Sequence, residues 1–370
     1  MKRGFRAGVH LVLAFLSPVV AIFHPPTLLA QDDSFFYHGL PYGSESTFNP
    51  ISVILNGGLD ELQSYGESHS IADIPWKGGA TSVWRNITAP LPVLNTYGWG
   101  NFLDHEIIPS SLSMERAQWF PNYTLHLVGG GMVYRKLEEW YDASGYPAPY
   151  VCAGVTAMVY HFVNEIVENG PAVFANEDPI PDLLIFDPLG IILFSFDGVS
   201  RYFSSTLSLN DWSFQPALSF GPPAVRNVGQ NFVIKYPLTS SGRTSLFYHF
   251  GAFGMLGLSL KNTSEESVSF GAGLTSKSVY HTSSTDLVPT VAIHVGPIAG
   301  IYFDRRNSLL ASLVVADNFN EIVRLNTFPG MLDIGGVSPG FFVSVGERAQ
   351  MTAGITASFS PVGIAARFPR

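Results

Sequence analysis

The stretch SVSFGAGLT at residues 267–275 decides how the C-terminal half of the chain is interpreted. Valine, phenylalanine, alanine and leucine alternate there with serine, glycine and threonine. Successive side chains of a β-strand point to opposite faces, so this stretch has one apolar face and one face of small or polar residues. A half-buried strand of a soluble protein usually carries charges on its wet face, and this stretch carries none.

The same alternation recurs through residues 206–370, with turn-like stretches between the segments. A narrow transmembrane barrel has this pattern, because one row faces lipid and the other faces a small polar lumen. We therefore predict an α+β chain whose residues 206–370 form an antiparallel membrane β-barrel of about eight to ten strands. A soluble β-sandwich also alternates and is the alternative. Phe368 resembles the aromatic end of outer-membrane barrels, although Pro369 and Arg370 follow it.

The N-terminus has the order of a secretory signal peptide. Lys2, Arg3 and Arg6 precede an apolar run, and Ala30 stands before a polar start at Gln31. This order predicts a signal peptide over residues 1–30, cleaved near Ala30. An uncleaved N-terminal membrane anchor is the alternative.

Charge and cysteine content exclude several classes of protein. Without the three basic residues of the signal peptide, 17 of the 20 Lys and Arg remain against 29 Asp and Glu, a net charge of −12. No basic patch suits nucleic acid, so we expect no nucleic-acid partner. Cys152 is the only cysteine, which excludes an intrachain disulfide and a cysteine-based metal site. Charged residues make up 13% of the chain, about half the usual share for a soluble domain.

Two regions precede the predicted barrel. Residues 31–122 mix aromatics, Gly, Pro and Asn, and we expect a loop-rich region with one short helix over residues 50–64. Residues 123–205 read as a helical segment. Its expected helices cover residues 123–143, 150–168 and 181–203, with Asp178 as a cap of the third and Pro188 as a kink or break.

Three consecutive glycines, Gly129, Gly130 and Gly131, interrupt the first of these helices. Each glycine costs a helix about 1 kcal/mol. The sequence therefore allows two interpretations: either the helix begins after them, or they permit a close contact with another helix.

The helical segment holds the densest group of reactive residues. His161 and Glu165 are four residues apart and share one face of a helix. With Asp182 or Asp187 they could form an acid–base pair or bind a metal through imidazole and carboxylate. These four are the candidate catalytic residues.

A structural role is the interpretation we favour from the sequence. Polar groups in an apolar helical layer usually pair with one another, for example Arg135 with Glu165 or Asp182, or Asp187 with a helix-end amide. No nucleophile elbow, phosphate loop or two-histidine metal motif is present. We accordingly expect no cofactor and no metal.

Part of this segment resembles uncharacterised bacterial exported families, domains of unknown function. The residues that carry the resemblance are HFVNE at 161–165 and PDLLIFDPLG at 181–190, within a stretch of roughly 80 residues from His126 to Phe203. The resemblance implies an outer-membrane location with a barrel behind the helices, and it carries over no catalytic residue.

The sequence thus supports two functions from different classes. The first is a non-enzymatic outer-membrane barrel, structural or a narrow pore, in contact with outer-membrane lipid and with a periplasmic N-terminal region. At about eight to ten strands the interior would be nearly filled by side chains. The second is a membrane-bound hydrolase or lipid-modifying enzyme that uses His161, Glu165 and Asp182 or Asp187. A third is an inner-membrane protein spanning at residues 148–164. Protein partners cannot be named from the sequence.

Overall fold

The computed structural model describes most of the chain after residue 33. The described ranges are 34–63, 70–111, 113, 116–169, 177–220, 223–251, 253–262, 265–282, 290–318, 321–346 and 349–368. The predicted signal peptide, residues 1–30, lies outside these ranges.

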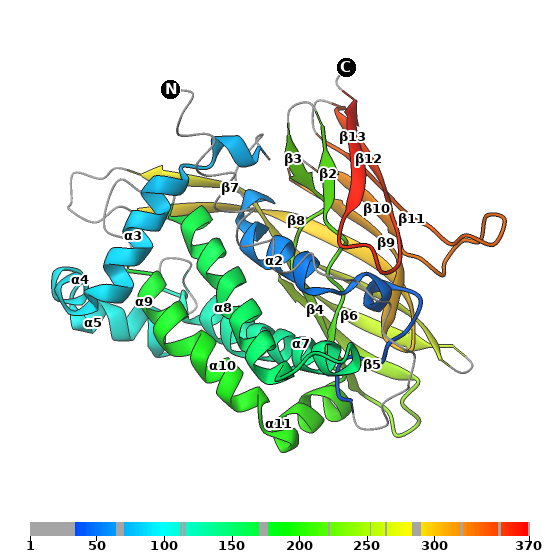
Figure 1. Cartoon of the computed structure of the whole chain (residues 1–370), viewed down its shortest axis with the longest axis horizontal. Coiled ribbons are helices and arrows are strands. Elements are labelled where there is room, and N and C mark those ends of the chain that lie inside the picture. The colour runs from blue at the N-terminus through cyan, green and yellow to red at the C-terminus, as the bar shows by residue number, and fades with distance from the viewer. Residues whose placement is uncertain are drawn as a thin grey trace.

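The N-terminal part of the chain is helical and packs beside a large sheet (Figure 1). Its two long central helices are α7 (Gly131–Ala143) and α8 (Pro149–Glu168). The other described helices are η1 (Ser44–Thr47), α2 (Pro50–Gly58), η2 (Asp60–Gln63), η3 (Ile71–Asp73), α3 (Trp76–Thr88), α4 (Pro90–Tyr97), α5 (Trp99–Phe102), η4 (Leu103–Ile107), α6 (Trp119–Pro121), η5 (Asn122–Gly130), α9 (Pro179–Pro181), η6 (Asp182–Phe186), α10 (Asp187–Phe194), α11 (Asp197–Arg201) and η7 (Tyr202–Thr206).

The helices expected from residue 123 onward are present, with differences in detail. Helix η5 runs directly into α7, so the first helix continues through the three glycines instead of beginning after them. The third helix breaks between Phe194 and Asp197, not at Pro188, which fits the first turn of α10. Asp178 precedes α9 but makes no side-chain capping hydrogen bond.

The description of residues 31–122 as loop-rich with one helix was wrong. Helices α3 and α4 lie there in addition to α2, which is capped by a reciprocal pair of bonds between Asn49 and Ser52. Tertiary packing overrides weak local propensity in these segments. Val83, for example, is fully buried against α8 despite the glycines and threonines of α3.

The C-terminal part forms one sheet of 13 strands. Neighbouring strands pair antiparallel except β13 and β2, which are parallel. The hydrogen-bonded order is β1-β4-β5-β6-β7-β8-β9-β10-β11-β12-β13-β2-β3. The strands are β1 (Asn210–Asp211), β2 (Ala217–Ser219), β3 (Ala224–Arg226), β4 (Asn231–Pro237), β5 (Thr244–Gly251), β6 (Phe253–Lys261), β7 (Glu266–Thr282), β8 (Thr290–Arg305), β9 (Ser308–Ala316), β10 (Val323–Thr327), β11 (Gly340–Val345), β12 (Met351–Thr356) and β13 (Gly363–Phe368).

The sheet corrects the prediction of a closed barrel with eight to ten strands. It has more strands, and no pairing joins its outer strands β1 and β3 within the described residues. The reason lies in residues 210–219. Residues 210–211 form β1 and pair with β4, and residues 217–219 form β2 and pair with β13. Between them, Trp212 and Phe214 pack into the core, and the hydrogen-bonded strand ladder is interrupted.

Helix α2 satisfies the backbone of this connecting segment. The Asn56 amide nitrogen donates to the Phe214 carbonyl at 2.7 Å, and its oxygen accepts from the Gly229 amide at 3.1 Å. The Ser44 hydroxyl donates to the Asp211 carbonyl at 3.2 Å. Backbone groups in the open part of the ladder therefore find partners in the N-terminal segment, as buried backbone groups must.

One face of the sheet encloses a packed core. Trp212 is fully buried, and its ring centroid lies 5.9 Å from Phe247 and 5.5 Å from Tyr302. Further members of this core are Phe214, Val233, Met255, Ile298, Leu309, Val314, Ala316 and Phe328. Side chains fill this interior, so the sheet does not enclose a wide open channel.

Lys235 and Arg324 are buried in that interior and are paired. The Lys235 ammonium lies 2.6 Å from the Asp304 carboxylate and 4.8 Å from the centre of the Trp212 indole. Arg324 contacts Glu321 at 2.8 Å and stacks over Phe214. Opposite charges at contact distance offset the cost of removing each from water.

The opposite, outer face of strands β6–β13 is apolar and exposed. The register places Leu258, Phe270, Ile301, Leu313, Leu325, Val343, Ala353 and Ala366 directly across from one another in a row over eight strands. Two flanking rows have the same character: Leu260, Val268, Phe303, Ala311, Thr327, Phe341, Ile355 and Ile364; and Leu256, Ala272, Ala299, Val315, Val323, Val345, Met351 and Phe368. We call these three rows the apolar band.

No residue of the apolar band is charged, and Thr327 is its only polar member. Ile301, Leu256 and Ile364 are 55%, 60% and 66% exposed. On β4 and β5 the same outer face is covered, because Phe232 and Phe250 pack against Met132, Leu137 and Tyr160 of the helical part. The helices therefore cover one end of the outer face and leave the band exposed.

Among the described residues, helix α8 is long and apolar enough to cross a membrane, and 39% of its apolar window is buried. Residues 179–194 and 197–206 are long and apolar enough only when taken together, and a bend of 84° separates them. Core helices of soluble proteins have the same length and hydropathy, so these helices are weak evidence for a membrane span.

Candidate functional site

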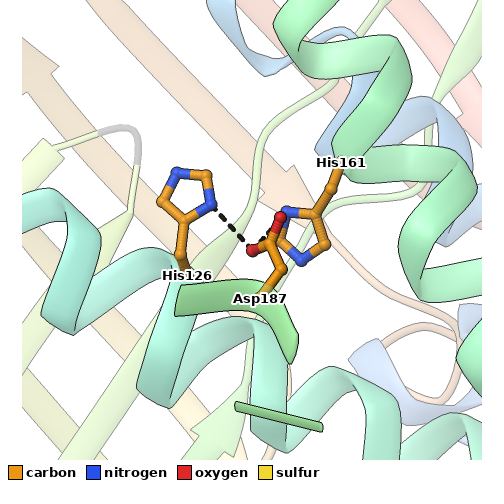
Figure 2. Close-up of side chains that lie close together, drawn as sticks. All are labelled: His126, His161 and Asp187. Carbon is orange, nitrogen blue, oxygen red and sulfur yellow. Dashed lines mark hydrogen bonds and ion pairs between the residues drawn. The ribbon is translucent and has the colours of Figure 1, made fainter. Parts of the chain in front are cut away.

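A buried cluster of two histidines and three carboxyl groups lies between helices η5, α8, η6 and α10. His126 stands on η5, His161 and Glu165 on α8, Asp182 at the start of η6 and Asp187 at the start of α10. We call these five residues the His–carboxylate cluster. Figure 2 shows His126 and His161 turning their rings toward Asp187 from two different helices.

Asp187 is the centre of the cluster. Its Oδ1 atom lies 2.9 Å from His126 Nδ1 and 3.1 Å from His161 Nδ1 (Figure 2). The two imidazole centroids are 5.2 Å apart. The other ring nitrogen of His126, Nε2, lies 3.5 Å from Asp182 Oδ2. His126 therefore stands between two aspartates, one at each ring nitrogen.

The carboxyl groups of the cluster are buried and incompletely satisfied. Glu165 is 0%, Asp187 2% and Asp182 3% exposed. Glu165 Oε1, Asp182 Oδ1 and Asp187 Oδ2 each lack a hydrogen-bond partner among the described residues. Buried polar atoms almost always have a partner. Glu165 and Asp182 contact each other, and Asp187 Oδ2 is left without a partner between the two imidazoles.

Burial and mutual repulsion govern protonation in the cluster. Burial, reinforced by Asp178, raises the pKa of Glu165 to about 8. Burial and the neighbouring Glu165 raise the pKa of Asp182 well above its usual value. Burial lowers the pKa of His161 to about 4 despite Asp187 beside it. Burial also opposes the charge on His126, but Asp187 outweighs it and raises that pKa.

Glycines bring the helices close enough to form the cluster. A Cβ atom on Gly130 would lie 2.8 Å from His161 Nε2. On Gly190 it would lie 2.8 Å from the Leu127 carbonyl and 3.0 Å from that of His126. Of the two interpretations of the glycine run, close helix contact is confirmed.

Two of the four helical elements in the cluster, η5 and η6, are π-helical. These wider turns are rare and frequently occur at functional sites. They carry His126 and Asp182, which face each other across the interface between η5 and η6.

The structure brings together all four candidate residues from the sequence: His161, Glu165, Asp182 and Asp187. The two pairings proposed for a purely structural role were wrong. Arg135 contacts Glu138, Glu139 and Asp197, and Asp187 contacts the two imidazoles instead of a helix-end amide.

His126, which contacts both Asp182 and Asp187, was not among the candidate residues predicted from the sequence. Its partner Asp187 is 61 residues away, so no local spacing joins them. The usable signal was indirect: His126 precedes the glycine run by three residues, and that run marks the place where another helix approaches.

Chemically, the cluster could hold a proton network or a cation. Two overlapping sets of ligand atoms lie within 4.8 Å of one another: His126, His161 and Asp187, and His126, Glu165 and Asp182. Comparison with protein-family models, curated proteins and solved structures finds no match to this chain, so the site is interpreted from its own chemistry.

Proposed function

We propose that this chain is an exported outer-membrane protein, non-enzymatic and of structural or binding type, whose sheet contacts lipid through the apolar band. The observation that carries the proposal is the register of eight neighbouring strands, which aligns three outward rows without a charge. Soluble proteins rarely expose an apolar surface of this extent, whereas outer-membrane sheets require one.

Three further features support a membrane setting. The inner face is occupied by small and polar side chains and a packed aromatic core, as in narrow membrane sheets. In the connecting segment at residues 210–219, the Asp211 and Phe214 carbonyls accept hydrogen bonds from η1 and α2, which matters because lipid offers no hydrogen bonds. The predicted signal peptide would deliver the chain to the envelope.

The filled interior favours a structural or binding role over conduction. Trp212, Phe247 and Tyr302 stack across it, and Lys235 is bonded to Asp304. A channel would need a continuous wet path through these side chains.

Membrane fractionation tests the proposal. The chain should be recovered with the outer membrane and resist urea extraction, and unboiled samples should migrate differently from boiled ones because the folded sheet resists detergent. Recovery as a soluble periplasmic protein with no change on boiling would overturn it.

The second candidate is the membrane-bound hydrolase or lipid-modifying enzyme that uses the cluster. In its favour, all four candidate acid–base residues converge. Against it, the side chains of His161, Glu165, Asp182 and Asp187 are at most 5% exposed, which leaves little surface for a substrate. His161→Ala and Glu165→Ala variants separate the two: loss of a lipid-processing activity in a folded protein would support the enzyme.

A further inference from the structure

The His–carboxylate cluster lacks a counter-charge. Glu165, Asp182 and Asp187 form no ion pair with Lys or Arg among the described residues. In the part of the chain that the structure describes, the basic groups that contact Asp182 and Asp187 are the imidazoles of His126 and His161. Three carboxyl groups removed from water with no permanent cation beside them are costly to bury.

Two kinds of partner could meet this need: protons, or a bound cation. One shared proton can join the Glu165 and Asp182 carboxyl groups, which are within hydrogen-bonding contact of each other, but it leaves Asp187 Oδ2 without a partner. Asp187 Oδ2 is buried without a partner, and two imidazole nitrogens face the other oxygen of the same carboxyl group. Together they point to a partner that accepts electron pairs.

We propose that His126 Nδ1, His161 Nδ1 and a carboxylate oxygen of Asp187 bind one divalent first-row transition metal ion of the zinc or cobalt kind. Glu165 and Asp182 lie behind His126 as its outer support. The inference concerns the helical part and does not depend on the lipid contact of the sheet.

The distances fit such a site. Ligand atoms placed tetrahedrally at about 2.0–2.1 Å from zinc stand about 3.3 Å apart. The distances from Asp187 Oδ1 to His126 Nδ1 and His161 Nδ1, 2.9 and 3.1 Å, differ from that spacing by a few tenths of an ångström. Small rotations of side chains would admit the ion.

Binding of the ion changes the tautomer of the two imidazoles, and this change accounts for their ring protons. The hydrogen bond between His126 Nδ1 and Asp187 Oδ1 places a ring proton on that nitrogen, and His161 Nδ1 lies 3.1 Å from the same oxygen. When the ion takes these positions, each neutral ring carries its proton on Nε2 instead, and a ring that was charged releases one proton. His126 Nε2 then donates to Asp182 Oδ2, now 3.5 Å away. A metal-bound histidine commonly donates its other ring N–H to a carboxylate in this way.

The ligand types select the metal. Two imidazole nitrogens and one carboxylate oxygen suit zinc, cobalt, iron or nickel, whereas magnesium and calcium prefer sites made only of oxygen. Because the three ligands come from η5, α8 and α10, the ion would join three helices. His161 and Asp187 are 4% and 2% exposed, so the ion would be largely shielded from solvent.

Metal content of the purified full-length protein tests the inference. After removal of adventitious ions and addition of Zn²⁺ or Co²⁺, we expect about one ion per chain bound tightly enough to survive gel filtration. Co²⁺ should give a visible absorption spectrum typical of nitrogen and oxygen ligands. No retained ion, or the same amount retained by every variant below, would overturn the proposal.

The variants compare the cluster with another histidine of the helical part. Asp187→Asn and His161→Gln should each weaken Zn²⁺ binding by at least about 100-fold, and Glu165→Gln by about 10-fold, the usual effect of an outer-support residue. His105→Gln is the control, since His105 contacts Asp104 outside the cluster. Circular dichroism confirms that each variant folds. If Asp187→Asn or His161→Gln fails to fold, the comparison rests on Glu165→Gln, which keeps the size and shape of the side chain. Equal Zn²⁺ affinity of Glu165→Gln and His105→Gln would contradict the inference.

Different results would overturn the outer-membrane proposal and the metal-site proposal. A soluble protein that still binds one ion would overturn the outer-membrane proposal alone. A membrane protein without the ion would overturn only the metal site.

Discussion

The interior of the sheet and the helical cluster bury charge in opposite ways. In the sheet, Lys235 and Asp304 meet at 2.6 Å and neutralise each other. In the helical part, Glu165, Asp182 and Asp187 crowd around two histidines without a permanent cation. The Lys235–Asp304 pair is therefore neutral from its own residues, whereas the proposed ion would neutralise the cluster. The two regions should respond differently to substitution and to chelators.

Breaking the pair in the sheet should have the largest effect. Lys235→Met leaves the Asp304 carboxylate, 0% exposed, without its cation. We expect a loss of about 3–5 kcal/mol in the free energy of unfolding, because an unpaired buried charge is strongly destabilising. Urea unfolding in detergent or lipid vesicles measures this, with and without chelator.

Lys261→Met is the matched control, because Lys261 is exposed at the end of β6. It should change stability by no more than about 0.5 kcal/mol. Equal stability of the two variants would show that water solvates Asp304 and that the carboxylate does not depend on Lys235.

The apolar band should show the next largest effect. Ile301→Lys places a charge in the central row, where lipid contact would cost about 2–4 kcal/mol. Ile334→Lys is the control, since Ile334 is 60% exposed but lies in the connection between β10 and β11. Unfolding from lipid vesicles should separate the two variants. If Ile301→Lys were as stable as Ile334→Lys, the band would face water.

The glycine contact of the cluster gives a third comparison. Gly130→Ala brings a methyl group to 2.8 Å from His161 Nε2, and we expect a loss of about 1–3 kcal/mol from overpacking, together with weaker Zn²⁺ binding. Gly198→Ala in α11 is the control, because nothing lies within 4 Å of its added Cβ. A Gly130→Ala protein with unchanged stability and Zn²⁺ affinity would mean that this contact does not shape the cluster.

The smallest expected change in stability, that of Asp182→Asn, should have opposite signs with and without the metal. Burial and Glu165 raise the pKa of Asp182, which costs stability at neutral pH. Asp182→Asn removes that cost, so with chelator present it should stabilise the protein by about 1 kcal/mol. With Zn²⁺ present it should destabilise by a similar amount, because His126 loses the carboxylate that orients it, which costs about 10-fold in affinity. Thermal unfolding in both conditions checks the reversal, and the same sign in both would contradict the account.

The contrast between the two regions also shows what could be predicted from the sequence. Strands such as β7 and β12 follow from period-two alternation, which is a local property of the chain. The strand number was too low because β1, β2 and β3 have only two or three residues and no visible period. Closure was wrong because it depends on pairing between distant segments, which no local pattern records.

The cluster was predictable where its spacing is helical. His161 and Glu165 are four residues apart, so their shared face could be read from the chain. The contacts of His126 with Asp182 and Asp187 depend on how three helices pack. The expected pairing of Arg135 with Glu165 failed for the same reason, since Glu138 and Glu139 on its own helix were nearer.

Hydrogen exchange with and without chelator tests the central contrast most directly. In the zinc-loaded protein, removal of the ion should speed amide exchange in η5, α8 and the η6–α10 segment, and leave the interior strands β4, β5 and β9 unchanged. That result would show that the helical cluster depends on an ion that the sheet does not need. Exchange that is unchanged everywhere, or faster throughout the sheet as well, would contradict the account.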